Sequence, residues 1–162
     1  MFTPDLMTLA EAVVARAQAR GLMLATAESC TGGLVAALIT SVAGSSAVLE
    51  QGAVTYSNAA KTRMLDVPAA LIEAHGAVSQ PVAEAMAAGA RTRAGVDLAV
   101  SITGIAGPGG GSDEKPVGLV HFGLATADGV QHLERRFAEG DRHAIRMAAT
   151  EQALQLLLGG LA

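Results

Sequence analysis

Hydroxyl, amine and thiol side chains gather in a few short polar segments of this otherwise apolar chain, and these segments are the candidates for chemistry. Residues 27–33 (AESCTGG) place a carboxylate, two hydroxyls and a thiol beside two glycines. Residues 43–46 (AGSS) add two serines, and residues 54–61 (VTYSNAAK) contain Tyr56 and Lys61. A serine hydroxyl beside an uncharged lysine is a metal-free arrangement for acyl transfer. The central question is therefore whether a serine and Lys61 meet.

Lys61 admits two placements with opposite roles. A lysine one helical turn beyond a strand end is usually a solvated surface residue. If its amine instead faces a pocket lined by glycine and alanine, burial disfavours the charged form and lowers its pKa. A neutral Lys61 can then accept the proton of a serine hydroxyl. The sequence leaves both placements open.

Residues 103–111 (TGIAGPGGG) form the most glycine-dense segment of the chain. The segment lacks the spacing of a phosphate-binding P-loop, and it lacks the Gly-x-Gly-x-x-Gly pattern in a strand-to-helix context. It is either a flexible surface loop or a backbone cradle for an anionic or planar ligand. Thr103 and Gly104 directly follow an apolar run and are the residues of this segment best placed to bind a ligand.

The histidines and the single cysteine give no metal-binding pattern. His75, His121, His132 and His143 are widely spaced, and no His-Glu-x-x-His motif is present, so we expect them to be structural or exposed. A single cysteine, Cys30, excludes an internal disulfide and a cysteine-only metal site. We interpret Cys30 as a small buried residue, and we predict no metal for the site.

Composition argues against several classes of partner. The chain has 162 residues, is 51% hydrophobic and only 2% aromatic, and carries a formal net charge of −4. Few, scattered basic residues and almost no aromatic residues argue against nucleic acid as a partner. No apolar run approaches the roughly 18 residues of a membrane span. The N-terminus lacks the features of a signal peptide, so we expect a cytoplasmic protein without a membrane partner.

Apolar periodicity and turn residues predict one compact α/β domain over residues 1–162, a mixed β-sheet with helices on both faces. Helices separate the first three strands, and a hairpin at Asp128-Gly129 joins the last two. Because ligands of open α/β sheets bind beyond the carboxyl ends of strands, we expect the polar turns to converge on one pocket. Strands are predicted at residues 22–27, 48–56, 98–102, 119–126 and 130–137, helices at 4–20, 31–40, 58 to about 66, from about 79 and after 141, and a helical turn at 68–75.

Three long segments resemble the CinA C-terminal domain family. They are residues 27–61 (AESCTGGLVAALITSVAGSSAVLEQGAVTYSNAAK), 75–90 (HGAVSQPVAEAMAAGA) and 101–118 (SITGIAGPGGGSDEKPVG), and the resemblance extends from about Leu6 to Leu157. It implies a compact α/β domain in a homo-oligomer, a dimer or larger. It also implies hydrolysis of the carboxamide of nicotinamide mononucleotide, a small-molecule nucleotide, to nicotinate mononucleotide and ammonia in pyridine nucleotide salvage. No metal or organic cofactor is implied.

The same resemblance implies where the site residues lie. Its polar site residues match Ser29, Ser46, Tyr56, Lys61, Thr103 and an arginine of residues 140–146, for which we choose Arg142 over Arg146. As further substrate-binding residues we expect Thr31, Gly32, Gly33 and Gly104, because their turns bring backbone N–H groups close to a ligand.

Two serines compete for the role of nucleophile. We favour Ser46, because it lies in a turn of small residues and is close in sequence to Tyr56 and Lys61. Ser29 then donates a hydrogen bond to the oxyanion or the nucleotide. The reverse assignment stays open, and both serines can instead serve as helix caps. In the expected reaction Lys61 deprotonates the serine, and Tyr56 orients Lys61 or relays the proton to departing ammonia.

Two other functions would use the same turns. One is a non-catalytic nucleotide-binding or sensor domain. The other is the hydrolysis of a different nucleotide, such as ADP-ribose. Measured turnover separates the first from an amidase, and a panel of substrates separates the second.

Overall fold

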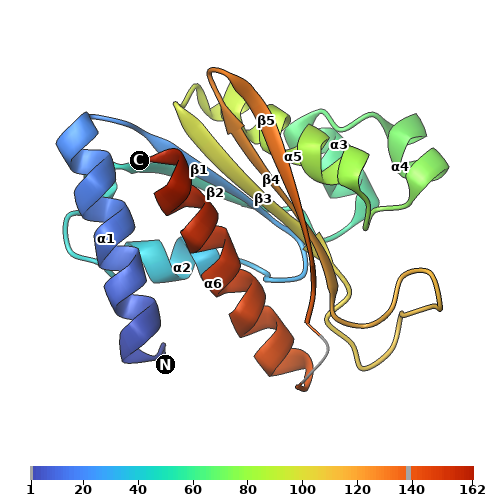
Figure 1. The fold of residues 1–162 in the computed structure, drawn as a ribbon. Helices are drawn as coiled ribbons and strands as arrows, with labels where there is room; N and C mark the ends of the chain where they lie inside the picture. Colours follow the sequence, from blue (N-terminus) through green and yellow to red (C-terminus); the bar gives the residue numbers. More distant parts are fainter. Residues whose placement is uncertain (1, 138–139) are drawn as a thin grey trace.

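A five-stranded mixed sheet lies between two layers of helices in the computed structural model of this chain, which describes residues 2–137 and 140–162 (Figure 1). The strands are β1 (Leu24–Glu28), β2 (Leu49–Val54), β3 (Leu98–Gly104), β4 (Leu119–Thr126) and β5 (Gly129–Arg136). The helices are α1 (Pro4–Arg20), α2 (Leu34–Thr40), α3 (Asn58–Leu65), α4 (Ala69–His75), α5 (Gln80–Ala94) and α6 (Arg142–Gly160), with a 3-10 turn η1 (Ser45–Ala47).

The strand order is β2-β1-β3-β4-β5, which makes β2 and β5 the edge strands. β1 pairs in parallel with β2 on one side and with β3 on the other, whereas β3, β4 and β5 are antiparallel neighbours. All five residues of β1 are buried, as is typical of a central parallel strand covered on both faces. The carboxyl ends of β1, β2 and β3 therefore meet at one edge of the sheet.

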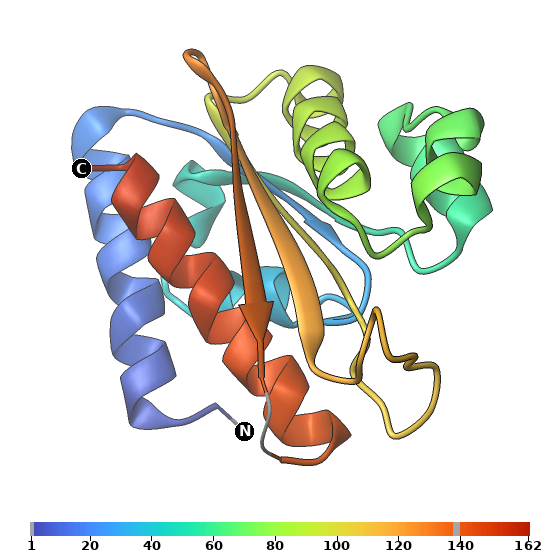
Figure 2. The same ribbon diagram turned by 45° about the vertical axis from the view of Figure 1, so that its right-hand side comes forward.

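Two apolar layers hold the helices to the sheet. α1, α2 and α6 cover one face, and α3, α4 and α5 cover the other (Figures 1 and 2). On the first face α1 begins at the cap Thr3, whose hydroxyl accepts the N–H of Leu6, and it ends at Gly21 in the left-handed conformation. Because the chain has few aromatic residues, the two layers are built mainly of Ala, Val, Leu and Ile.

One glycine allows α5 to pack directly on the end of α3. A Cβ on Gly89 would overlap the carbonyl oxygen of Leu65, the last residue of α3. The absence of a side chain at Gly89 thus sets the position of α3, the helix that carries Lys61.

The predicted fold class is confirmed, and so is the order of the strands, whereas the helical turn expected at residues 68–75 is a full helix, α4. Ser57 and Asp141 cap α3 and α6, because their side chains accept the N–H groups of Ala60 and Ala144. The second helix begins at Leu34 rather than at residue 31. Residues 29–33 form a turn before it, in which both glycines have positive φ.

Candidate active site

Ser29 and Lys61 meet beyond the carboxyl ends of β1 and β2. The Nζ atom of Lys61 lies 3.0 Å from Oγ of Ser29 and 2.8 Å from the carbonyl oxygen of Thr55. Lys61 is 1% exposed and Ser29 is 8% exposed. Of the two placements open to Lys61, the structure has the buried one.

Burial controls the protonation of Lys61. Loss of hydration lowers the pKa of Lys61 below the usual lysine range, and the nearby Cys30 opposes that shift only in part. Neither atom in contact with Nζ belongs to a carboxylate, so hydrogen bonds rather than an ion pair hold the amine. An amine held in this way is suited to accept the proton of Ser29.

The turn that carries Ser29 is braced from two sides. The carboxylate of Glu28 is fully buried and accepts the N–H groups of Val35 at 2.9 Å and Ala36 at 3.1 Å, at the start of α2. On the other side Arg146 of α6 donates to the carbonyl oxygens of Cys30 and Thr31, both at 3.0 Å. Glu28 therefore anchors the turn, and Arg146 holds its backbone.

Arg142 closes the rim of the site. Its Nη2 atom donates to the hydroxyl of Tyr56 at 3.0 Å, and its Nη1 atom donates to the carbonyl oxygen of Gly107 at 2.7 Å. The Tyr56 side chain is 63% exposed, so it stands at the mouth of the site rather than beside Lys61. Tyr56 and the glycine-dense loop are thus linked across the opening by one guanidinium group.

A cavity of about 220 Å³ connects these groups. Thr103 and Gly104 line it from the end of β3, and the Thr103 hydroxyl donates to the carbonyl oxygen of Ala77 at 2.8 Å. Thr31, Gly32 and Gly33 are absent from this lining, which includes Ser29 and Cys30 of the same turn. The full lining is Ser29, Cys30, Tyr56, Asn58, Lys61, Ala77, Val78, Thr103, Gly104, Ala106 and Arg142.

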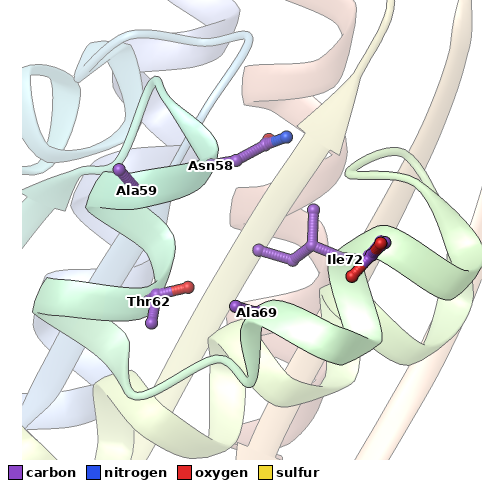
Figure 3. A pocket seen from close by; sticks show the side chains of 6 residues that line it. Asn58, Ala59, Thr62, Ala69 and Ile72 are labelled. Atoms are coloured by element: carbon purple, nitrogen blue, oxygen red, sulfur yellow. The ribbon is translucent and has the colours of Figure 1, made fainter.

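Two further cavities adjoin the first. One, of about 440 Å³, shares Ala106 and Arg142 with it and is also lined by His143 and Arg146. The other, of about 350 Å³, shares Asn58 and lies between α3 and α4, where Ile72 faces α3 (Figure 3). A ligand larger than a pyridine ring can therefore extend from Lys61 in either direction.

Ser46 lies apart from this cluster, which corrects the expectation that it pairs with Lys61. It is exposed in η1, directly before β2, whereas Lys61 follows β2. The length of β2, about 20 Å for six residues at ~3.3 Å each, separates the two ends. Closeness in sequence misleads here, because a strand carries the chain from one edge of the sheet to the other.

Cys30, the single cysteine of the chain, is buried in the turn that carries Ser29, and the histidines lie elsewhere. Burial raises the pKa of Cys30 to about 12, an effect that its own N–H opposes, and such a thiol is inert. None of the four histidines lines the cavity with Lys61. Among residues 2–137 and 140–162, no group of three or more His, Cys, Asp or Glu side chains could hold a metal ion.

Two features of the site were not predicted from the sequence. Asn58 lines the cavity, and the carbonyl oxygen of Thr55 contacts the Lys61 amine. Asn58 carried a usable signal, because residues three apart share a helix face and Lys61 is three positions further on. The role of the Thr55 carbonyl had no signal, since a backbone oxygen is the same in every residue.

The chain was then compared with known proteins. A family model described as the CinA C-terminal domain matches residues 6–161. The chain belongs to this family. A solved structure of the same family, the competence/damage inducible protein CihA from Agrobacterium tumefaciens, superposes with a TM-score of 0.96 at 48% identity, over 98% of this chain and 97% of that one.

Two kinds of curated relative differ in length. The Nicotinamide-nucleotide amidohydrolase PncC of Escherichia coli (strain K12) is 54% identical over 157 residues, which cover 97% of this chain and 95% of that protein. The CinA-like protein of Anaeromyxobacter dehalogenans (strain 2CP-C) is 57% identical over 149 residues, 92% of this chain but only 36% of that protein. The chain thus spans about a third of the longer relatives. No helix in the described part of the chain is long and apolar enough to cross a membrane.

Proposed function

We propose that this chain hydrolyses the carboxamide of nicotinamide mononucleotide to nicotinate mononucleotide and ammonia, with Ser29 as nucleophile and Lys61 as base. The observation that carries the proposal is the 3.0 Å contact between Oγ of Ser29 and the buried amine of Lys61. The identity to the E. coli amidohydrolase, which extends over nearly the whole of both chains, supports the same substrate.

In the first half of the reaction, neutral Lys61 takes the Ser29 proton while Oγ bonds to the carboxamide carbon. The C=O π electrons move onto oxygen, and a tetrahedral oxyanion forms. The carbonyl then re-forms, the C–N bond breaks, and the Lys61 ammonium returns its proton to the departing nitrogen, which leaves as ammonia. The quaternary pyridinium withdraws electrons from the carboxamide carbon, which favours the attack.

In the second half, water hydrolyses the acyl ester on Ser29. Lys61, neutral again, takes a proton from the water as its oxygen attacks the ester carbon. Collapse of the second tetrahedral intermediate releases the pyridine carboxylic acid, and the proton returns to Oγ of Ser29. These steps draw only on the two side chains and water.

The charges around the site favour one direction for the ribosyl phosphate. Arg142 and Arg146 both line the 440 Å³ cavity, and neither is paired with a carboxylate within the described residues. Asp141 of the same lining uses Oδ1 to accept the N–H of Ala144. The 350 Å³ cavity offers Glu73 and no cation. We therefore expect the phosphate beside Arg142, in the larger cavity.

The test is ammonia release from nicotinamide mononucleotide by Ser29→Ala, with Ser46→Ala as the matched control. We expect Ser29→Ala to lose activity by a factor of 10³ or more, and Ser46→Ala to retain it. A covalent nicotinoyl adduct located by mass spectrometry on Ser29 would identify the nucleophile directly. Full activity in Ser29→Ala would overturn the assignment. A panel with ADP-ribose and nicotinamide riboside separates the rival hydrolase and sensor functions.

We also infer that the chain forms a homo-oligomer through the edge strand β2. Of the four large hydrophobic residues that are exposed within residues 2–137 and 140–162, Val54 and Tyr56 lie on or just beyond β2, and Met64 lies on α3. An unpaired edge strand with exposed apolar side chains is a ready interface. Light scattering should report a dimer or larger assembly, and Val54→Lys should shift it toward the monomer. A wild-type chain that is monomeric at high concentration would contradict this inference.

A further inference from the structure

We propose that the backbone N–H groups of Gly104 and Cys30 hold the carboxamide oxygen of the substrate when it becomes an oxyanion. The inference rests on the proposed amidase reaction and adds two catalytic groups to it. Both residues line the cavity that contains Ser29 and Lys61.

β3 extends beyond the end of β1, and the N–H of Gly104 therefore has no hydrogen-bond partner on β1. Ser29 donates its N–H to the carbonyl oxygen of Ile102, so Ile102 turns its backbone polar groups toward β1. Because the direction repeats every two residues along a strand, Gly104 turns its N–H to the same side. The next rung of that ladder would bring the Gly104 N–H to the carbonyl oxygen of Ser29, but this oxygen accepts from Gly32 instead. No acceptor for the Gly104 N–H is found in residues 2–137 and 140–162.

Of the N–H groups of residues 29–33, those of Ser29 and Gly32 donate to backbone oxygens, whereas those of Cys30, Thr31 and Gly33 have no backbone acceptor among the described residues. Of these three residues, only Cys30 lines the cavity that contains Lys61. Gly32 donates to Ser29 and Leu34 to Thr31, while the first N–H groups of α2 donate to the Glu28 carboxylate. Because the Glu28 carboxylate occupies these N–H groups, they are not available to bind an anionic ligand. The Cys30 N–H has no acceptor in the described chain other than its own sulfur, and a contact within one residue is too bent to be a good hydrogen bond.

Unpaired N–H groups in a buried place indicate a ligand. Cys30 is only 6% exposed, and more than nine in ten buried backbone N–H groups find a partner. Here two unpaired N–H groups lie next to the nucleophile, one on the buried residue after it and one on Gly104, a half-buried residue of the adjacent strand. The N–H of the residue after the nucleophile serves as an oxyanion donor in α/β-hydrolases, and the turn at Ser29 has the same strand-to-helix connection.

The decisive experiment replaces single N–H groups by oxygen and compares each ester with a chain that has the same side chain at that position. Glycolic acid is incorporated in place of Gly104 by translation with a chemically charged tRNA, and in place of the exposed Gly109 as the matched control. A side-chain substitution would not serve, since a Cβ at Gly104 would lie 2.6 Å from Cγ2 of Val120. The Cys30 N–H is removed by incorporating lactic acid at position 30, which carries the alanine side chain and an ester oxygen. Its control is Cys30→Ala, which has the same side chain and retains the N–H.

We expect each ester at position 104 or 30 to lower kcat for nicotinamide mononucleotide by about 10²–10³ and to change KM little, because the contact strengthens only in the transition state. The ester at Gly109 should leave both constants unchanged. As a second readout, the ratio of rates for the carboxamide and its thioamide analogue should fall in the 104 and 30 esters, since sulfur is a weak acceptor.

The outcomes separate the inference from the proposed function. If the wild-type chain releases no ammonia from nicotinamide mononucleotide, the proposed reaction fails and the inference fails with it. If the wild type is active and the esters at 104 and 30 match the Gly109 ester, the reaction stands and the oxyanion assignment is overturned. A thermal unfolding midpoint within a few degrees of the wild type shows that an ester loses activity without losing its fold.

Discussion

Lys61 is the residue whose environment decides the chemistry. The chain has two lysines, and only Lys61 is buried, in contact with a hydroxyl and a carbonyl oxygen. In the unfolded chain a lysine has a pKa of about 10.4, and burial holds that of Lys61 lower in the folded protein. Under the proposed reaction, the base is therefore a lysine and neither a histidine nor a carboxylate.

The pH dependence of the reaction should follow Lys61. Because only the neutral amine accepts a proton, kcat/KM should rise with pH through the lowered pKa of Lys61 and then level off. Lys61→Arg keeps a permanent charge and should lose activity by about 10²–10⁴ at every pH tested. Lys115→Arg is the control and should remain active, because among the described residues the Nζ atom of Lys115 makes its hydrogen bond to the carbonyl oxygen of His75, away from the site. A pH profile unchanged in Lys61→Arg would rule out the base.

At the scale of elements, the contact between α5 and α3 holds Lys61 in place. Gly89→Ala should destabilise the fold by about 1–3 kcal/mol, because the new Cβ overlaps the carbonyl oxygen of Leu65. In an open helical position the same change gains about 0.5–1 kcal/mol. Gly159→Ala in α6, which has no neighbouring atom within 4 Å of the new Cβ, provides that comparison. Urea unfolding of both variants measures the two signs, and a stabilised Gly89→Ala would show that α3 and α5 separate at little cost.

The elements could be predicted from the sequence, but the edge of the sheet on which each polar turn lies could not. Caps such as Ser57 and glycines such as Gly21 act on residues close to them in the sequence, so the helix ends that they set can be predicted from the sequence. The meeting of Ser29 with Lys61 depends on β2 running parallel to β1, a long-range pairing. The unpaired N–H of Gly104 depends on the register of β1 and β3, because it exists only where β3 extends beyond the end of β1.

For the molecule as a whole, burial of Lys61 predicts a pH-dependent stability. Below its folded-state pKa, Lys61 is charged in both states, and the folded chain bears the full cost of burying that charge. As pH rises toward about 10.4, the folded chain loses the proton first, so the unfolded state binds more protons and wild-type stability increases. The free energy of unfolding of the wild type relative to Lys61→Met should therefore grow with pH in this window. Unfolding curves at a series of pH values measure it, and a flat or falling difference would contradict it.

The last long helix completes a site whose reacting residues all lie far upstream. Arg142 joins Tyr56 to the glycine-dense loop, and Arg146 holds the turn at Cys30. During translation, a nascent chain that ends before α6 already contains Ser29 and Lys61, but lacks the guanidinium groups that hold the turn after Ser29 and the rim of the cavity. Under the proposed reaction, products truncated before α6 should therefore be inert toward nicotinamide mononucleotide.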